Sequence, residues 1–264
     1  MIFETHAHYD DEKFNEDRQE LIAGLPEKGI TTVINVGASM RGCEASVELA
    51  KQFSHVYSAV GVHPSDIEDL SEASMTRLRE LASYEKTVAI GEIGLDYYWD
   101  KEEQVQERQR YWFRRQLELA KEMALPVIIH SRDAAKDTFD ILSAPEYRGI
   151  RGVIHCYSYS PEMAKEYVKL GYYIGIGGVV TFKNAKKLVE TVEALPMDRI
   201  LLETDSPYMA PEPNRGTRND STNLIYVADK IAFIKGTNTD EVIIATRENA
   251  RTLFSKGGTY GNTW

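Results

Sequence analysis

The chain has 264 residues, of which 42% are hydrophobic and 27% are charged, and its formal net charge is −10. This balance is that of a globular protein and excludes a disordered or fibrous chain. The acidity argues against broad, non-specific binding of nucleic acid, but it leaves room for a local positive site, since bound metal ions can be the largest charges in a cleft.

The length fits one large α/β domain or two ordinary domains, because α/β barrels run to about 200–250 residues. Two cysteines, Cys43 and Cys156, are too few for a disulfide framework. The chain does not open with a basic segment followed by an apolar one, and no apolar stretch approaches the roughly 18 residues of a membrane span. We therefore expect a soluble, cytoplasmic protein that does not engage membranes.

The first residues form a short apolar run that leads directly into His6 and His8. On a strand, alternate side chains share one face, so both imidazoles point the same way and could grip one cation. Two histidines at this spacing occur by chance about as often as they form a metal site. The rest of the chain has to decide between these explanations.

Strand and helix patterns alternate along the chain after this opening. Further strands are expected at 31–36, 56–60, 87–90, 126–129, 152–154, 172–174 and 199–203, and helices at 18–28, 42–53, 74–83, 103–124, 133–146, 161–170, 183–194, 221–235 and 239–255. Eight strands alternating with eight or more helices predict an α/β protein of the (β/α)8 TIM-barrel type. Without a linker or a repeat, the simplest organisation is one domain over 1–256 and a loose tail over 257–264.

Histidines and carboxylates recur just past the ends of these predicted strands. They are His63 after 56–60, Glu92 after 87–90, His130 after 126–129, His155 after 152–154 and Asp205 after 199–203. Each has an ordinary explanation, such as a turn histidine or a solvated loop carboxylate, but the recurrence favours a functional one. The carboxyl ends of barrel strands meet at one rim, so we expect Glu92, His130, His155 and Asp205 to gather there with His6 and His8. We expect His63 to contact substrate at the mouth of the site.

Four imidazoles (His6, His8, His130 and His155) and two carboxylates (Glu92 and Asp205) are more ligands than one metal ion normally takes. This favours two divalent ions with one carboxylate bridging them. Their identity, Zn, Mn or Mg, stays open because histidine and carboxylate sites accept each of them. Such a centre can activate a water and polarise a carbonyl or phosphoryl oxygen, which implies hydrolysis.

Two later stretches leave alternatives open. The glycine cluster at 175–178 could hold a phosphate through its backbone amides, although tight packing is the simpler explanation. The irregular stretch at 208–219 carries Arg215 and Arg218 and is either a solvated surface loop or a lid that contacts phosphate.

Several motifs, in the same order along nearly the whole chain, resemble the TatD family of metal-dependent deoxyribonucleases, within the wider amidohydrolase-like barrels. They are Thr5-His6-Ala7-His8, Gly61-Val62-His63-Pro64, Gly91-Glu92-Ile93-Gly94-Leu95-Asp96-Tyr97, His130-Ser131-Arg132, His155-Cys156-Tyr157-Ser158, Glu203-Thr204-Asp205-Ser206-Pro207 and the final Asn249-Ala250. Because the motifs are separate and ordered, the resemblance is specific.

The resemblance implies a division of the ligands between the two ions. One ion is bound by His6 and His8 together with Glu92 and Asp205; the second is bound by His130 and His155, with Glu92 bridging. The two carboxylates are then also the catalytic residues, and Asp205 is placed to accept a proton from the attacking water.

Substrate contacts are implied for His63 and Arg132, which match family positions near the metals, and Arg215 is a further candidate from the loop. The chain also departs from the family pattern. Glu4 stands where the family usually has Asp, Ser65 replaces a common His and Tyr159 a common Gly, and the loop differs at Asn214, Thr217 and Asp220-Ser221. These departures leave the ligand set intact and bear on the choice of substrate.

We therefore expect a deoxyribonuclease that cleaves phosphodiester bonds, with DNA as its substrate and no obligate protein partner. One alternative is an amidohydrolase that acts on an ester or amide, such as an aminoacyl group on transfer RNA, because the same activated water attacks a carbonyl carbon. Another is a metal-binding barrel that has lost turnover.

Overall fold

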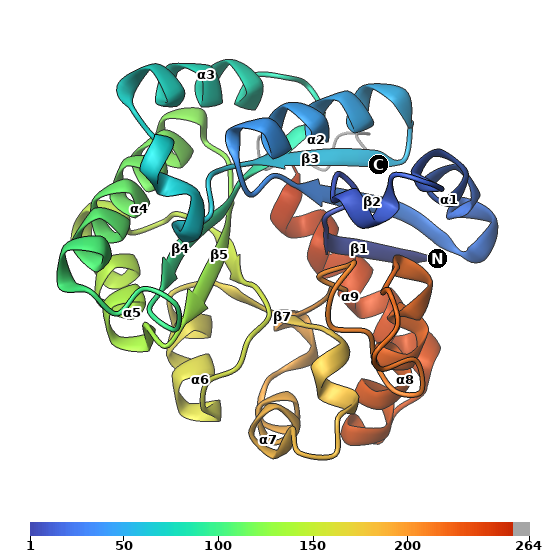
Figure 1. The fold of residues 1–264 in the computed structure, drawn as a ribbon. Coiled ribbons are helices and arrows are strands. Elements are labelled where there is room, and N and C mark those ends of the chain that lie inside the picture. Colours follow the sequence, from blue (N-terminus) through green and yellow to red (C-terminus); the bar gives the residue numbers. More distant parts are fainter. Residues whose placement is uncertain (256–264) are drawn as a thin grey trace.

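The computed structural model describes residues 1–255 and places eight parallel strands side by side in chain order. The strands are β1 (Ile2–Ala7), β2 (Ile30–Val36), β3 (Val56–Val60), β4 (Thr87–Asp96), β5 (Val127–Arg132), β6 (Gly152–Ile154), β7 (Tyr173–Ile176) and β8 (Ile200–Leu202). The helices form an outer ring around these strands (Figure 1). This arrangement confirms the expected (β/α)8 barrel. The tail expected at 257–264 lies outside the described residues.

The helices of the outer ring follow the strands along the chain. They are α1 (Arg18–Gly24), α2 (Met40–Gln52), α3 (Glu72–Ala82), α4 (Glu103–Met123), α5 (Ala135–Ser143), α6 (Pro161–Lys169), α7 (Lys186–Ala194), α8 (Leu224–Lys235) and α9 (Thr239–Phe254). Short 3₁₀ helices stand between them at Glu12–Phe14, Pro26–Lys28, Pro64–Asp69, Pro145–Tyr147, Gly178–Thr181, Met197–Arg199 and Ser221–Asn223. No helix of the described chain is both long and apolar enough to cross a membrane.

A compact apolar cluster fills the inside of the barrel. It takes residues from all eight strands and from the end of α9, where Phe254 lies 6.3 Å from Phe3 between ring centroids. Ile128 of this cluster stands two residues before His130 on β5, so the two side chains face the same side of that strand. Val153 likewise stands two residues before His155, which directly follows β6. The apolar layer therefore supports a polar layer nearer the carboxyl ends of the strands.

The first and last strands are joined by a polar seam. His6 and His8 are held there by backbone bonds, since Asp205 N donates to His6 O at 3.0 Å and His8 N donates to Ser206 O at 2.8 Å. Below them the buried carboxylate of Glu4 accepts from Thr204 N at 2.9 Å and from Thr204 Oγ1 at 2.7 Å. Closure of the barrel thus brings the histidines of β1 beside Asp205.

Strands β4 and β5 are longer than their apolar runs predict. The sequence pattern ends them at Ile90 and Ile129, but the paired strands continue to Asp96 and Arg132. Glycine makes the extension feasible, because a Cβ on Gly94, which has φ +148°, would collide with the carbonyl oxygen of His130. The register also shifts between Ile90 and Ile93, an irregularity of the kind that re-aims side chains near active sites.

Candidate metal centre

His6 and His8 face two carboxylates at the carboxyl end of the barrel. Their Nε2 atoms are 3.0 Å apart, and Glu92 Oε2 lies 3.4 Å from the first and 3.6 Å from the second. Asp205 Oδ1 lies 3.4 Å from His8 Nε2 and 3.8 Å from His6 Nε2. Ligands about 2.1 Å from a tetrahedral ion stand roughly 3.4 Å from one another. The four atoms therefore have the spacing of a metal site.

The second oxygen of Glu92 faces another set of imidazoles. Oε1 lies 2.8 Å from His130 Nδ1, 3.4 Å from His155 Nε2 and 3.8 Å from His63 Nε2. One carboxylate thus presents one oxygen to each group of histidines. This is the placement expected of a bridging ligand, and all six residues expected to gather at the rim do so.

His63 is closer to the cluster than a substrate contact requires. Its ring lies edge-on to that of His130, with centroids 4.2 Å apart, and potential ligand atoms of His63, Glu92 and His130 fall within 4.8 Å of one another. Burial lowers the pKa of His63 to about 4, so the ring is neutral near pH 7. Its position fits a substrate contact or a metal ligand equally, and the sequence suggested only the former.

The hydrogen bond made by His8 fixes its tautomer. Nδ1 lies 2.8 Å from the carbonyl oxygen of Val36, which can only accept, so Nδ1 carries the proton. An imidazole must be neutral to bind a metal ion, and in that state the lone pair of Nε2 points at Glu92 and Asp205. A lone pair held toward carboxylates at this distance suits a cation between them.

Two buried carboxylates lie behind His130 and His155. Asp96 Oδ2 lies 3.1 Å from His130 Nε2, while Glu203 Oε1 lies 3.2 Å from His155 Nδ1 and also accepts from Cys156 N. A hydrogen-bonded carboxylate such as Asp96 sets the rotation of a ligating imidazole. Sequence reasoning assigned neither residue a role, although both stand inside the motifs that carry the ligands.

Opposite charges are balanced within this buried cluster. Burial would raise the pKa of Glu92, but His155, His130 and His6 hold it well below its usual range. Burial would also raise the pKa of Asp205, but the hydrogen bond from His8 holds that pKa below its usual value. Burial would lower the pKa of His8, but the hydrogen bond with Asp205 outweighs that effect and raises the pKa to about 9. Ionised carboxylates that draw protons onto imidazoles will also draw a cation, so the donor set fits a divalent metal ion.

A cavity of about 760 Å³ opens over the cluster. Arg132 lines it, and its guanidinium lies 3.8 Å from the ring centroid of Tyr98. Of the other arginines expected near the site, Arg215 lies over the ring of Phe182, 4.2 Å from its centroid, and Arg218 pairs with Asp17. The structure thus brings Arg132 to the cavity, while Arg215 is not among its lining residues and its substrate contact stays a prediction.

The glycine cluster packs closely against the same site. A Cβ on Gly175 would collide with the carboxylate of Glu203, which is the tight packing considered from the sequence. Gly177 and Gly178 line the cavity. A phosphate contact by their amides stays a prediction.

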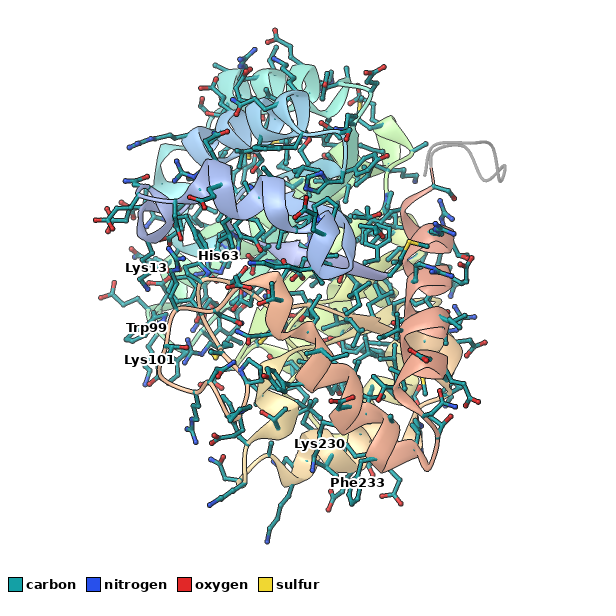
Figure 2. The ribbon with its side chains drawn as sticks, turned by 90° about the vertical axis from the view of Figure 1, so that its right-hand side faces the viewer. Lys13, His63, Trp99, Lys101, Lys230 and Phe233 are labelled. Atoms are coloured by element: carbon teal, nitrogen blue, oxygen red, sulfur yellow. The ribbon has the colours of Figure 1, made fainter. Side chains whose placement is uncertain are left out.

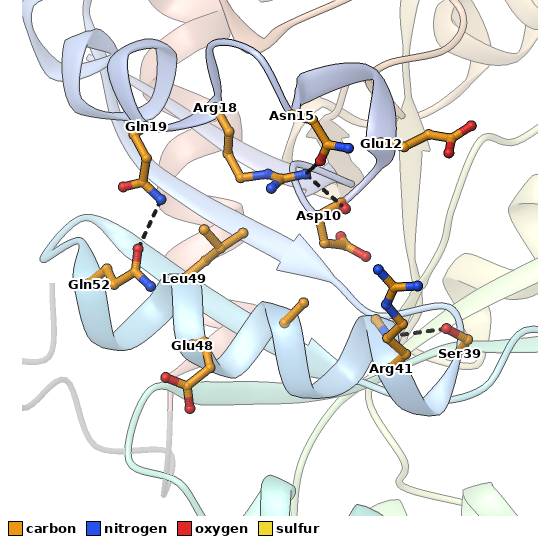
Figure 3. A pocket seen from close by; sticks show the side chains of 12 residues that line it. Asp10, Glu12, Asn15, Arg18, Gln19, Ser39, Arg41, Glu48, Leu49 and Gln52 are labelled. Carbon is orange, nitrogen blue, oxygen red and sulfur yellow. Dashed lines mark hydrogen bonds between the residues drawn. The ribbon is translucent and has the colours of Figure 1, made fainter.

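A second hollow, of about 530 Å³, lies between the stretch before β2 and helix α2 (Figure 3). Its polar groups largely bond one another: Arg18 donates to Asn15 Oδ1 at 2.8 Å and to the carbonyl oxygens of Asp10 and Asp11 at 3.1 and 2.9 Å. Gln19 donates to Gln52 across the groove. We assign no chemistry to this groove.

A family model described as TatD related DNase matches residues 3–255. "Uncharacterized metal-dependent hydrolase YabD" of Bacillus subtilis is 41% identical over 254 residues, which cover 96% of this chain and 99% of that one. "3'-5' ssDNA/RNA exonuclease TatD" of Cronobacter sakazakii is 32% identical, with 97% and 98% covered. The crystal structure of YJJV, a TatD homologue of Escherichia coli K12, has a TM-score of 0.89 and 31% identity, with 96% and 97% covered. With histidines and carboxylates converging on one rim, these matches show that the chain belongs to the TatD family and is a metal-dependent hydrolase.

Proposed function

We propose that this protein is a nuclease that hydrolyses phosphodiester bonds, with DNA as its substrate. The observation that carries the proposal is the position of Glu92, whose two oxygens face separate groups of histidines at the floor of an open cavity. Paired divalent ions are typical of enzymes that act on phosphate esters. A relative of similar length is named as an exonuclease of single-stranded DNA and RNA.

We further propose that the cluster holds two divalent ions. His6, His8 and Asp205 would hold one, His130 and His155 the other, and Glu92 would stand between them. Bound there, the ions would supply Lewis acidity that polarises a phosphoryl oxygen and lowers the pKa of water.

The side chains around the cluster would move the proton and position the ester. Asp205 lines the cavity and is ionised, so it can accept a proton from the attacking water. Arg132 offers N–H donors to a phosphate at the rim. His63, neutral and facing the cavity, would hold the substrate by a hydrogen bond.

Hydrolysis of a carboxylic ester or amide is the second candidate, because the same proton acceptor and cations suit attack on a carbonyl carbon. The guanidinium of Arg132 at the rim favours an anionic substrate over a neutral one.

We also propose a cytoplasmic location, with which the two unpaired cysteines accord.

The test is a hydrolysis panel with purified protein on single-stranded DNA, duplex DNA, RNA and simple carboxylic esters. Each substrate is assayed as prepared, after chelation, and after return of Zn, Mn or Mg. We expect cleavage of DNA that chelation abolishes and metal restores. Efficient ester hydrolysis without cleavage of any nucleic acid would support the second candidate and contradict the nuclease.

A further inference from the structure

An exposed tryptophan stands at the mouth of the cavity. Trp99 is 68% exposed and lines the cavity together with Arg132. Figure 2 shows it on the same side of the molecule as His63, which faces the metal cluster. An exposed indole forgoes the large favourable free energy that burying its apolar surface would provide. A face left open beside the site therefore suggests a flat apolar group that covers it during binding.

The side chains of Tyr98 and Arg132 form a small cluster with Trp99. The guanidinium of Arg132 lies 3.8 Å from the ring centroid of Tyr98 and 5.6 Å from that of Trp99. The rings of Tyr98 and Trp99 meet edge to face, with centroids 4.7 Å apart. A cation is thus held against two rings, an arrangement that serves both a phosphate and a base.

The turn that carries Trp99 is fixed to the metal cluster. Asp96 Oδ1 accepts from the backbone N–H groups of Tyr98 and Trp99 at 2.9 and 3.4 Å, while its other oxygen lies 3.1 Å from His130 Nε2. Gln109 of α4 donates to the side chain of Asp100 at 2.7 Å and braces the same turn. The backbone that carries the indole is therefore held at a set position relative to the proposed ions.

A similar pairing stands elsewhere on the mouth. Tyr208 lines the cavity, is 45% exposed, and has Lys13 Nζ 4.1 Å from its ring centroid. Aromatic rings beside cations are the recurrent contacts of proteins that bind single strands, where bases stack on the rings and the cations follow the phosphates.

We propose that Trp99, with Arg132 beside it, is a base-binding subsite: the indole stacks on an unpaired nucleobase adjacent to the phosphate held at the metal cluster. The proposal rests on the proposed nuclease function and specifies its substrate as a single strand. In a duplex both faces of an internal base are covered by its neighbours, so an internal base cannot stack on a fixed indole without unpairing.

The kinetic test uses Trp99→Ala on a single-stranded oligonucleotide. Stacking on an aromatic side chain contributes about 1–3 kcal/mol per base, so KM should rise roughly 5- to 150-fold while kcat changes little. Trp99→Phe should recover much of the loss. Phe233→Ala is the matched control, since Phe233 is 80% exposed, has Lys230 5.4 Å from its ring centroid, and lies away from the mouth (Figure 2).

An abasic oligonucleotide identifies the group that stacks. Replacing the base beside the scissile phosphate with hydrogen should raise KM for the parent protein by about the same factor, and Trp99→Ala should add little to it. Full additivity of the two changes would contradict the contact, because coupled groups are non-additive.

A binding readout separates this subsite from the nuclease proposal. A phosphorothioate-linked oligothymidylate should quench the tryptophan fluorescence of the parent protein, and Trp99→Phe should remove most of the quenching. Cleavage of DNA with quenching and KM unaffected by the Trp99 variants would overturn the subsite and leave the nuclease standing. Quenching at Trp99 without cleavage of any nucleic acid would support the subsite and overturn the nuclease.

Discussion

Asp205 is the side chain on which proton transfer depends in this account. Asp205→Asn keeps the shape and one oxygen that can face His8, but an amide is a far poorer base. We expect most of the bound metal to remain and kcat to fall on the order of 10²-fold or more, the scale of general-base effects. Metal analysis and steady-state kinetics on the best DNA substrate measure both.

The control is Asp198→Asn, which makes the same change at an exposed position in the 3₁₀ helix before β8. It should behave as the parent protein in both assays. Parent-like turnover of Asp205→Asn with its metal in place would show that the proton acceptor lies elsewhere.

Asp96 holds His130, a proposed metal ligand, and the consequence can be measured without turnover. Asp96→Ala removes the oxygen 3.1 Å from His130 Nε2 and frees the ring to rotate. Loss of such a partner typically weakens metal affinity about 10- to 100-fold, and we expect a change of that size at one of the two proposed sites. Competitive titration with a chromogenic chelator tests it; unchanged affinity at both sites would contradict the orienting role.

At the scale of elements, the close contact of β7 with Glu203 predicts an unusual cost for a small substitution. Gly175→Ala places a Cβ against the carboxylate of Glu203, and this side-chain end cannot swing away freely because it is buried and accepts a hydrogen bond from Cys156 N. We expect a loss of about 1–3 kcal/mol in the free energy of unfolding, the usual cost of overpacking. Gly24→Ala is the matched control, because α1 has open space there and alanine should be neutral or slightly stabilising. Urea unfolding measures the free energy of unfolding of both variants, and equal values for the two would contradict the close contact between Gly175 and Glu203.

The sequence predicts the ends of an element well when neighbouring residues set them, and poorly when contacts with a distant strand set them. The run at 56–60 predicts β3 residue for residue, because the polar pair Ser54-His55 precedes it and Gly61 follows it. In β4 the glycines at 91 and 94 resemble a turn, yet they allow the strand to continue beside β5. The extension depends on pairing with a strand that lies elsewhere in the sequence, so the local residue pattern does not predict it.

The same limit applies to the site. Residues toward the carboxyl ends of the strands are predictable because barrel topology gathers them whatever the details of packing. The expectation that Glu92 and His130 follow their strands is wrong, since both lie inside the extended β4 and β5. Asp96 and His130 are 34 residues apart, and Glu203 and Cys156 are 47 apart. Their contacts depend on side-chain directions across neighbouring strands, which no local spacing encodes.

For the whole molecule, a net charge of −10 limits how nucleic acid can be held. Arg218 is engaged by Asp17, so Lys13 and Arg132 are the main cations beside the aromatic rings of the mouth. Each phosphate neutralised on a single strand contributes about −0.7 to the slope of log K against log salt, so we expect a shallow slope of roughly −1 to −2. Fluorescence anisotropy across a salt series measures it. A slope near zero with brisk ester hydrolysis would favour the amidohydrolase.

The most direct test of the account is the metal content of paired histidine variants. The parent protein should carry about two ions per chain, and His6→Ala/His8→Ala and His130→Ala/His155→Ala should each lose about one, because each pair faces its own oxygen of Glu92. His55→Ala is the control, since His55 bonds Ile22 O away from the cluster. Elemental analysis of the folded variants gives the stoichiometry. Two ions in the parent, one in each double variant and two in the control is the predicted result, and unchanged metal in both double variants would contradict it.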